Sequence, residues 1–196
     1  MKENSAIRMI LTLVVIAVVV AGIMSTVNSV TAPVIAENSE RELNAALAEV
    51  IDADNFVKVA EYEGNELYSA EKGGEDIGAC VVWFAPGYGG DVKVLTGVNN
   101  SLEVTGIRIL EHSETPGLGA NATKESFYGQ FTGKNKEIGV KKNSPGENDI
   151  QAISGATITS KAVTEAVNMS LSEAEKYFNN RENPLICYFG EGEPNE

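Results

Sequence analysis

Residues 77–110 read IGACVVWFAPGYGGDVKVLTGVNNSLEVTGIRIL, and this stretch decides the predicted fold. The run from Ile77 to Phe84 is short and apolar, which is typical of a buried β-strand. It ends in PGYGG at residues 86–90, a segment rich in residues that favour turns. The sequence therefore predicts a strand followed by a tight change of direction.

A β-hairpin is predicted directly after this turn. Two apolar segments, Val92 to Val98 and Leu102 to Leu110, lie on either side of Asn99-Asn100. Within the second segment the alternation of apolar residues changes phase at Gly106. A β-bulge costs little at glycine, so we expect a bulge at this position.

One helix is predicted before these strands in the sequence, and another is predicted after them. Glu37 to Val50 and Lys161 to Phe178 both place apolar residues at helical spacing. The apolar positions are Leu43, Ala46, Leu47 and Val50 in the first helix, and Val163, Val167, Leu171, Ala174 and Phe178 in the second. The predicted fold class is therefore α+β, with one domain that has a mainly antiparallel sheet and flanking helices.

An N-terminal transmembrane helix is predicted from Met9 to Val27, where no residue is charged. A helix of about 20 apolar residues spans a bilayer core. A cleaved signal peptide is the alternative, with cleavage after Ala21, but the uncharged stretch continues beyond that point and favours an anchor. Basic residues precede the span, and the next one after it is Arg41, so the N-terminus is expected in the cytoplasm. Pro33 is expected to interrupt the chain after the anchor.

Composition excludes several classes of function. The net charge of −13 argues against a nucleic-acid partner, because phosphate contacts need clustered Lys and Arg. The chain has one histidine, His112, and two cysteines, Cys80 and Cys187. These are too few for a structural zinc site or an iron–sulfur cluster, so no metal site is predicted. The cysteines are expected to be separate thiols rather than a disulfide.

The first motif with chemical meaning is SGATITS, residues 154–160, placed just before the last predicted helix. Small residues allow close approach of a ligand, and a helix N-terminus presents free N–H groups and a positive dipole end. These properties suit a phosphate group. Ordinary helix capping by Ser or Thr is the alternative explanation for the same residues.

The second motif is EHSETPGLG, residues 111–119, which directly follows the predicted hairpin. It combines a proline turn, two glycines and several polar side chains. A metal or acid–base site formed by His112 and two neighbouring glutamates is one interpretation, but a hydrogen-bonded loop histidine is the simpler one.

The two motifs, in this order behind a single membrane span, resemble the G subunit of the Rnf electron-transport complex. The C subunit of the sodium-pumping NADH:quinone reductase is similar. The resemblance covers nearly the whole chain, including the PGYGG segment. It implies FMN bound covalently, through a phosphoester on Thr157 that a flavin transferase forms.

The resemblance also implies which residues bind the cofactor. The cofactor-binding residues are expected to be Ser154, Gly155, Ala156, Thr157, Thr159 and Ser160 around the phosphate, and Glu114, Thr115, Gly117, Leu118 and Gly119 beside the flavin ring. No catalytic side chain is expected. One position departs from the pattern: Gln151 stands where the usual target of the transferase has an aspartate.

The implied domain organisation has five parts. Residues 1–8 form a cytoplasmic N-terminus, 9–27 the transmembrane helix, 28–55 a stalk with an amphipathic helix, 56–186 the covalent FMN-binding domain and 187–196 a C-terminal tail. The domain is expected on the extracytoplasmic side of the bacterial inner membrane.

The implied function is electron transfer within a membrane-bound, ion-translocating ferredoxin:NAD oxidoreductase. The chain would act as one subunit of a translocase, with multi-span and iron–sulfur or flavin subunits as partners, and would not turn over substrate alone. Three alternatives stay open: the C subunit of the quinone reductase, a membrane-anchored binding module without a redox role, and a secreted FMN-binding protein acting alone.

Overall fold

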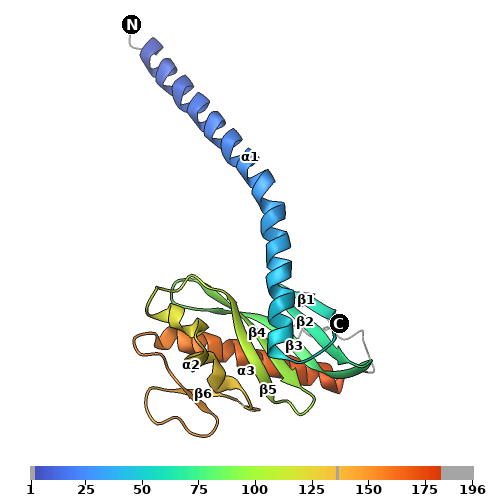
Figure 1. The fold of residues 1–196 in the computed structure, drawn as a ribbon. Helices are drawn as coiled ribbons and strands as arrows, with labels where there is room; N and C mark the ends of the chain where they lie inside the picture. Colours follow the sequence, from blue (N-terminus) through green and yellow to red (C-terminus); the bar gives the residue numbers. More distant parts are fainter. Residues whose placement is uncertain (1–2, 136, 182–196) are drawn as a thin grey trace, which may run out of the picture. The chain divides into compact units, whose positions relative to one another are not determined.

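The structure is a computed structural model that describes residues 3–135 and 137–181 (Figure 1). It begins with one long α-helix, α1 (Glu3–Val50), which contains Pro33. The predicted interruption at Pro33 is therefore wrong. A proline inside a helix removes a single backbone hydrogen bond, and the long helical segments on both sides outweigh this local loss.

The chain divides into two compact units between Leu43 and Asn44. In the first unit, α1 carries the predicted membrane span. Arg8–Val50 is the one helix among the described residues that is long and apolar enough to cross a membrane. Its most apolar window has a mean hydropathy of 2.7, and none of that window is buried. Such an exposed apolar surface needs a lipid or protein environment.

The second unit contains a five-stranded antiparallel sheet. Its strands are β1 (Asn55–Tyr62), β2 (Asn65–Lys72), β3 (Glu75–Pro86), β4 (Asp91–Asn99) and β5 (Val104–Glu111). They pair in chain order, each antiparallel to the next. The α+β class, the strand at residues 77–84 and the hairpin are thus confirmed. Strands β1 and β2 had no clear apolar pattern and were not predicted.

Strand β5 has two bulges in its pairing with β4, and the one near the predicted glycine lies one residue before it. Gly97 pairs with Gly106, and Val98 pairs with Val104, which leaves Thr105 as the extra residue. The Thr105 hydroxyl donates a hydrogen bond to the carbonyl of Val50 at 2.5 Å. A Cβ atom on Gly97 would lie 2.7 Å from that carbonyl oxygen. The glycines therefore let the end of α1 pack directly on the sheet.

Helix α3 (Thr157–Asn179) packs against β3 and β4. It contributes Val163, Val167, Leu171 and Ala174 to the core, as predicted. The strands contribute Val81, Val94 and Val98 to the same core. Successive side chains of a strand point to opposite faces of a sheet. The last turn of α1 adjoins Gly97 and Gly106, so Ala46, Leu47 and Val50 are buried on the face opposite α3.

The segment between β5 and α3 is built from short elements. These are η1 (Gly119–Thr123), α2 (Glu125–Tyr128), η2 (Gly129–Phe131), β6 (Gly139–Lys141) and β7 (Asp149–Gln151). Strands β6 and β7 form a separate parallel pair. Strand β7 ends shortly before α3, so this pair helps to position the SGATITS motif.

Cys80 is a buried, free thiol in β3, and burial raises its pKa to about 12. This agrees with the predicted separate thiol. Cys187 and the predicted tail at residues 187–196 lie outside the described residues.

Candidate functional site

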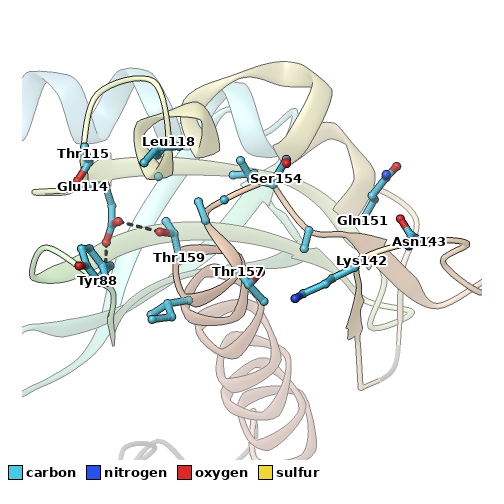
Figure 2. Close-up of a pocket in the computed structure, with 16 residues that line it drawn as sticks. Tyr88, Glu114, Thr115, Leu118, Lys142, Asn143, Gln151, Ser154, Thr157 and Thr159 are labelled. Atoms are coloured by element: carbon cyan, nitrogen blue, oxygen red, sulfur yellow. Dashed lines mark hydrogen bonds between the residues drawn. The ribbon is translucent and has the colours of Figure 1, made fainter.

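A cavity of about 830 Å³ lies where the two motifs meet (Figure 2). This volume is within the range of small-molecule and cofactor sites. The lining residues come from four segments: Tyr88; Glu114, Thr115, Leu118 and Gly119; Lys142 and Asn143; and Gln151, Ala152, Ile153, Ser154, Gly155, Ala156, Thr157, Ile158 and Thr159. The fold thus brings together two motifs that are far apart in sequence.

Glu114 holds three of these segments in place. Its side chain accepts hydrogen bonds from the backbone N–H groups of Tyr88 at 2.7 Å and Gly89 at 3.2 Å. Its second carboxylate oxygen accepts a hydrogen bond from the Thr159 hydroxyl at 2.7 Å. Glu114 is 6% exposed and Thr159 is 1% exposed. One buried carboxylate therefore connects the β3–β4 turn, its own loop and the first turn of α3.

The electrostatics of Glu114 follow from these contacts. Burial alone would raise the pKa of its carboxyl, but the hydrogen bonds from Thr159, Gly89 and Tyr88 stabilise the charged form. The result is a pKa below the ordinary value of 4.5. Glu114 is therefore ionised at neutral pH and serves as a fixed structural anion.

Two glycines leave space for this carboxylate. A Cβ atom on Gly119 would lie 2.3 Å from one Glu114 oxygen, and a Cβ atom on Gly87 would lie 2.3 Å from the other. Both separations are far inside van der Waals contact. Close packing around Glu114 thus explains Gly87 in the PGYGG segment and Gly119 in the EHSETPGLG segment.

Two hydrogen bonds of the Ser160 hydroxyl stabilise the SGATITS segment. The Ser160 hydroxyl accepts a hydrogen bond from the backbone N–H of Ile153 and donates one to the carbonyl of Ala156, both at 2.9 Å. Gly155 has a φ of +77°, a conformation that favours glycine. Together these features form a tight turn that leads into α3.

Helix α3 begins at Thr157, earlier than predicted, and Ala156 is its N-cap residue. No side chain caps this helix end. The capping explanation of the motif is therefore wrong. The first N–H groups of α3 are left without a side-chain partner, and they lie beside the cavity, where they suit an anion.

Thr157 differs from the other hydroxyls next to it. The hydroxyls of Thr159 and Ser160 are buried and hydrogen-bonded within the protein. Thr157 is half-buried and lines the cavity, and its hydroxyl makes no hydrogen bond to any other described residue. Its hydroxyl is thus available for a ligand. Ser154 also lines the cavity, but it is exposed and precedes the helix.

Of the predicted binding residues, all but Gly117 and Ser160 line the cavity. Gly117 has a φ of +80° and shapes the loop, and Ser160 braces the turn before α3. The sequence did not predict seven lining residues: Tyr88, Lys142, Asn143, Gln151, Ala152, Ile153 and Ile158. Tyr88 lies in the PGYGG segment, which the resemblance covers without giving Tyr88 a role, while Lys142 and Asn143 carry no signal in the sequence.

Among the described residues, Lys142 is the only cationic one that lines the cavity. It is exposed and forms no ion pair within residues 3–135 and 137–181. Figure 2 shows its side chain directed towards the start of α3, where Thr157 lies. The cation and the helix N-terminus together make this end of the cavity favourable for a phosphate.

His112 belongs to the loop rather than to a reactive centre. Its Nδ1 atom accepts a hydrogen bond from the backbone N–H of Glu114 at 3.2 Å, consistent with a hydrogen-bonded loop histidine. Within the described part of the chain, no group of three or more His, Cys, Asp or Glu side chains is placed to hold a metal ion.

The fold and site place the chain in the class of FMN-binding domain proteins. Residues 87–172 match the FMN-binding domain family, and residues 1–50 match the family described as the RnfG N-terminal region. The first match includes Glu114, Lys142 and Thr157. It therefore covers the cavity and the residues that hold it together.

Similar known proteins define the family more narrowly. The G subunit of the proton-translocating ferredoxin:NAD(+) oxidoreductase complex of Clostridium ljungdahlii is 36% identical, over 90% of this chain and 96% of the relative. The G subunit of the Na(+)-translocating complex of Acetobacterium woodii is 40% identical, over 82% of this chain and 87% of the relative. The chain belongs to the family of Rnf complex G subunits, as the sequence motifs predicted.

Solved structures confirm the fold. The C subunit of the Na(+)-translocating NADH-quinone reductase from Parabacteroides distasonis superposes with a TM-score of 0.53 at 24% identity, over 70% of this chain and 83% of that chain. NqrC from Shewanella oneidensis gives a TM-score of 0.52 at 18% identity, over 68% of this chain and 70% of that chain. At these identities the likeness concerns the fold alone.

Proposed function

We propose that the chain carries FMN covalently on Thr157 and transfers electrons as a subunit of an ion-translocating ferredoxin:NAD oxidoreductase complex. One observation carries the attachment site: Thr157 presents an uncommitted hydroxyl at the uncapped start of α3, inside a cavity of cofactor size. The match to the FMN-binding domain family supports the choice of cofactor. The names of the G-subunit relatives support the complex.

The residues present fit this cofactor. The Thr157 hydroxyl oxygen would lose its proton and displace the leaving group from the phosphate of an activated flavin donor, which forms the ester bond. Lys142 and the N-terminus of α3 would balance the phosphate charge. When bound, FMN supplies electron exchange through its isoalloxazine ring, and no side chain needs to move a proton for that purpose. The role of the chain is to hold and orient the group. Attachment by a flavin transferase would keep it from dissociating on the outer face of the membrane.

The direct test of the proposal is covalent flavin in the purified protein. The full chain, co-expressed with a flavin transferase, should remain yellow and fluorescent after denaturation and gel electrophoresis. A denatured wild-type chain without flavin would contradict the proposal, because a non-covalent cofactor is lost on denaturation.

The charge of Lys142 is expected to assist attachment of the flavin phosphate at Thr157. Lys142→Ala should lower the rate of flavin attachment by about threefold, since an exposed charge pair contributes up to about 1 kcal/mol. Lys142→Arg should keep most of the rate. The matched control is Lys141→Ala, because Lys141 is adjacent and exposed but does not line the cavity. Equal rates for Lys142→Ala and the control would exclude this role.

The orientation in the membrane is a further part of the proposal. The basic residues Lys2 and Arg8 precede the apolar span, and the positive-inside rule then places the FMN domain outside the cytoplasm. We expect alkaline phosphatase fused to the C-terminus to be active and green fluorescent protein at the same site to be dark. The reverse pattern would place the domain in the cytoplasm.

A further inference from the structure

Tyr88 is an exposed aromatic residue on a rigid turn. Its side chain is 71% exposed, more than any other large hydrophobic residue that the structure describes outside α1. The turn itself is held by the Gly87 N–H bond to the Gly90 carbonyl at 2.9 Å and by the bonds of Tyr88 and Gly89 to Glu114. These bonds fix the backbone of the turn, while the Tyr88 side chain is left exposed.

Two other exposed apolar side chains line the same cavity. Leu118 is 45% exposed and Ile158 is 53% exposed. They come from the EHSETPGLG loop and the first turn of α3, so three separate segments contribute to one apolar rim. Single exposed apolar residues are common, but a group around one cavity indicates a surface that a ligand covers.

The cavity therefore has two unlike ends. In Figure 2, Tyr88 and Leu118 lie on one side of Thr157, and Lys142, Asn143 and Gln151 lie on the other. FMN is divided in the same way, with an anionic phosphate at one end and a flat, largely apolar ring at the other. If the phosphate is bonded to Thr157 near Lys142, the ring extends towards Tyr88 and Leu118.

Glu114 connects the two sides of the site. The Tyr88 N–H and the Thr159 hydroxyl bind the two oxygens of the same Glu114 carboxylate, each at 2.7 Å. Only one carboxylate therefore separates the aromatic turn from the first turn of α3. Tyr88 and Thr157 line the same cavity, so a flavin attached at Thr157 would share that cavity with the Tyr88 side chain.

From this geometry we infer that the Tyr88 side chain stacks on the isoalloxazine ring and, with Leu118 and Ile158, forms the ring-binding half of the site. This inference rests on the proposed attachment of FMN at Thr157. Stacking between aromatic rings adds to the free energy of simple area burial. Tyr88 is thus a positioning residue for the flavin ring.

Flavin fluorescence provides a signature that a purely structural role of Tyr88 would not produce. A stacked phenol transfers an electron to the excited flavin, and the reduced flavin returns that electron to the phenol without emission, so the contact shortens the fluorescence lifetime. We expect the full-length, flavin-bearing Tyr88→Leu protein, purified in detergent without partner subunits, to have a severalfold longer mean lifetime than wild type. The matched control is Tyr62→Leu, since Tyr62 is 50% exposed and does not line the cavity.

A second variant keeps the test decisive if the leucine protein does not acquire flavin. Tyr88→Trp retains an aromatic, electron-rich ring, and we expect its flavin lifetime to be at least as short as that of wild type. An unchanged lifetime in Tyr88→Leu, or a lengthened one in Tyr88→Trp, would overturn the stacking inference and leave the attachment at Thr157 intact. Absence of covalent flavin from wild type would overturn both.

Discussion

Thr157→Ala is expected to remove all covalent flavin from the chain while leaving the domain folded. Thr157 is half-buried, and its hydroxyl makes no hydrogen bond to another described residue, so its loss leaves no buried donor or acceptor without a partner. Without the hydroxyl, no ester bond to a phosphate can form at this position. In-gel fluorescence of the denatured protein measures the loss, and circular dichroism measures whether the fold is kept.

Two variants sharpen this prediction. Thr157→Ser keeps a hydroxyl at the first residue of α3 and should keep attached flavin. Ser154→Ala removes another hydroxyl that lines the cavity close to Thr157 in the sequence and should have no effect on attachment. Flavin that persists in Thr157→Ala but disappears in Ser154→Ala would assign the ester to Ser154 instead.

Glu114→Ala is expected to lower the free energy of unfolding by about 3–5 kcal/mol, because it leaves buried donors without partners. Three donors lose their acceptor: the N–H groups of Tyr88 and Gly89 and the Thr159 hydroxyl. The turn, the loop and the start of α3 would separate, so flavin attachment should fall with stability. Chemical denaturation monitored by circular dichroism gives the change.

Glu111→Ala is the control for this variant, because Glu111 is the last residue of β5, three residues before Glu114, and is exposed. Its effect should stay within about 0.5 kcal/mol. If Glu114→Ala were no more destabilising than Glu111→Ala, the carboxylate would not hold the site together.

The ionisation of Glu114 should also make the free energy of unfolding depend on pH. Its folded-state pKa lies below the ordinary value of 4.5, so its stabilising effect is complete above that pH and is lost as the pH falls through the folded-state pKa. In Glu114→Gln the amide does not titrate. The stability difference between wild type and Glu114→Gln should therefore shrink as the medium becomes acidic, and a difference that stayed constant would contradict the lowered pKa.

The parts of the fold with strong apolar patterns were predictable from sequence. Strand β3, the β4–β5 hairpin and helix α3 all carry nearly continuous apolar runs or clear helical spacing. Strands β1 and β2 do not, because their sequences NFVKVAEY and NELYSAEK are rich in polar residues and only partly buried. Their pairing depends on neighbours in the sheet rather than on their own pattern.

The two motifs of the functional site could be predicted from the sequence. The positions and contacts of their individual side chains could not. In the sequence, Thr157, Thr159 and Ser160 are equivalent hydroxyls near a helix start. The fold separates them, since Thr159 binds Glu114 and Ser160 binds the turn before α3. Lys142 gave no signal, because its position at the cavity depends on the course of the chain between β6 and β7.

The central claim is that Thr157 carries FMN, and peptide mass spectrometry of the wild-type chain tests it most directly. The chain would be co-expressed with a flavin transferase and digested, and the peptide that contains residues 154–160 would be fragmented. We expect a mass gain equal to one FMN minus one water, located on Thr157. An unmodified peptide, or a modification on a different residue, would contradict the claim.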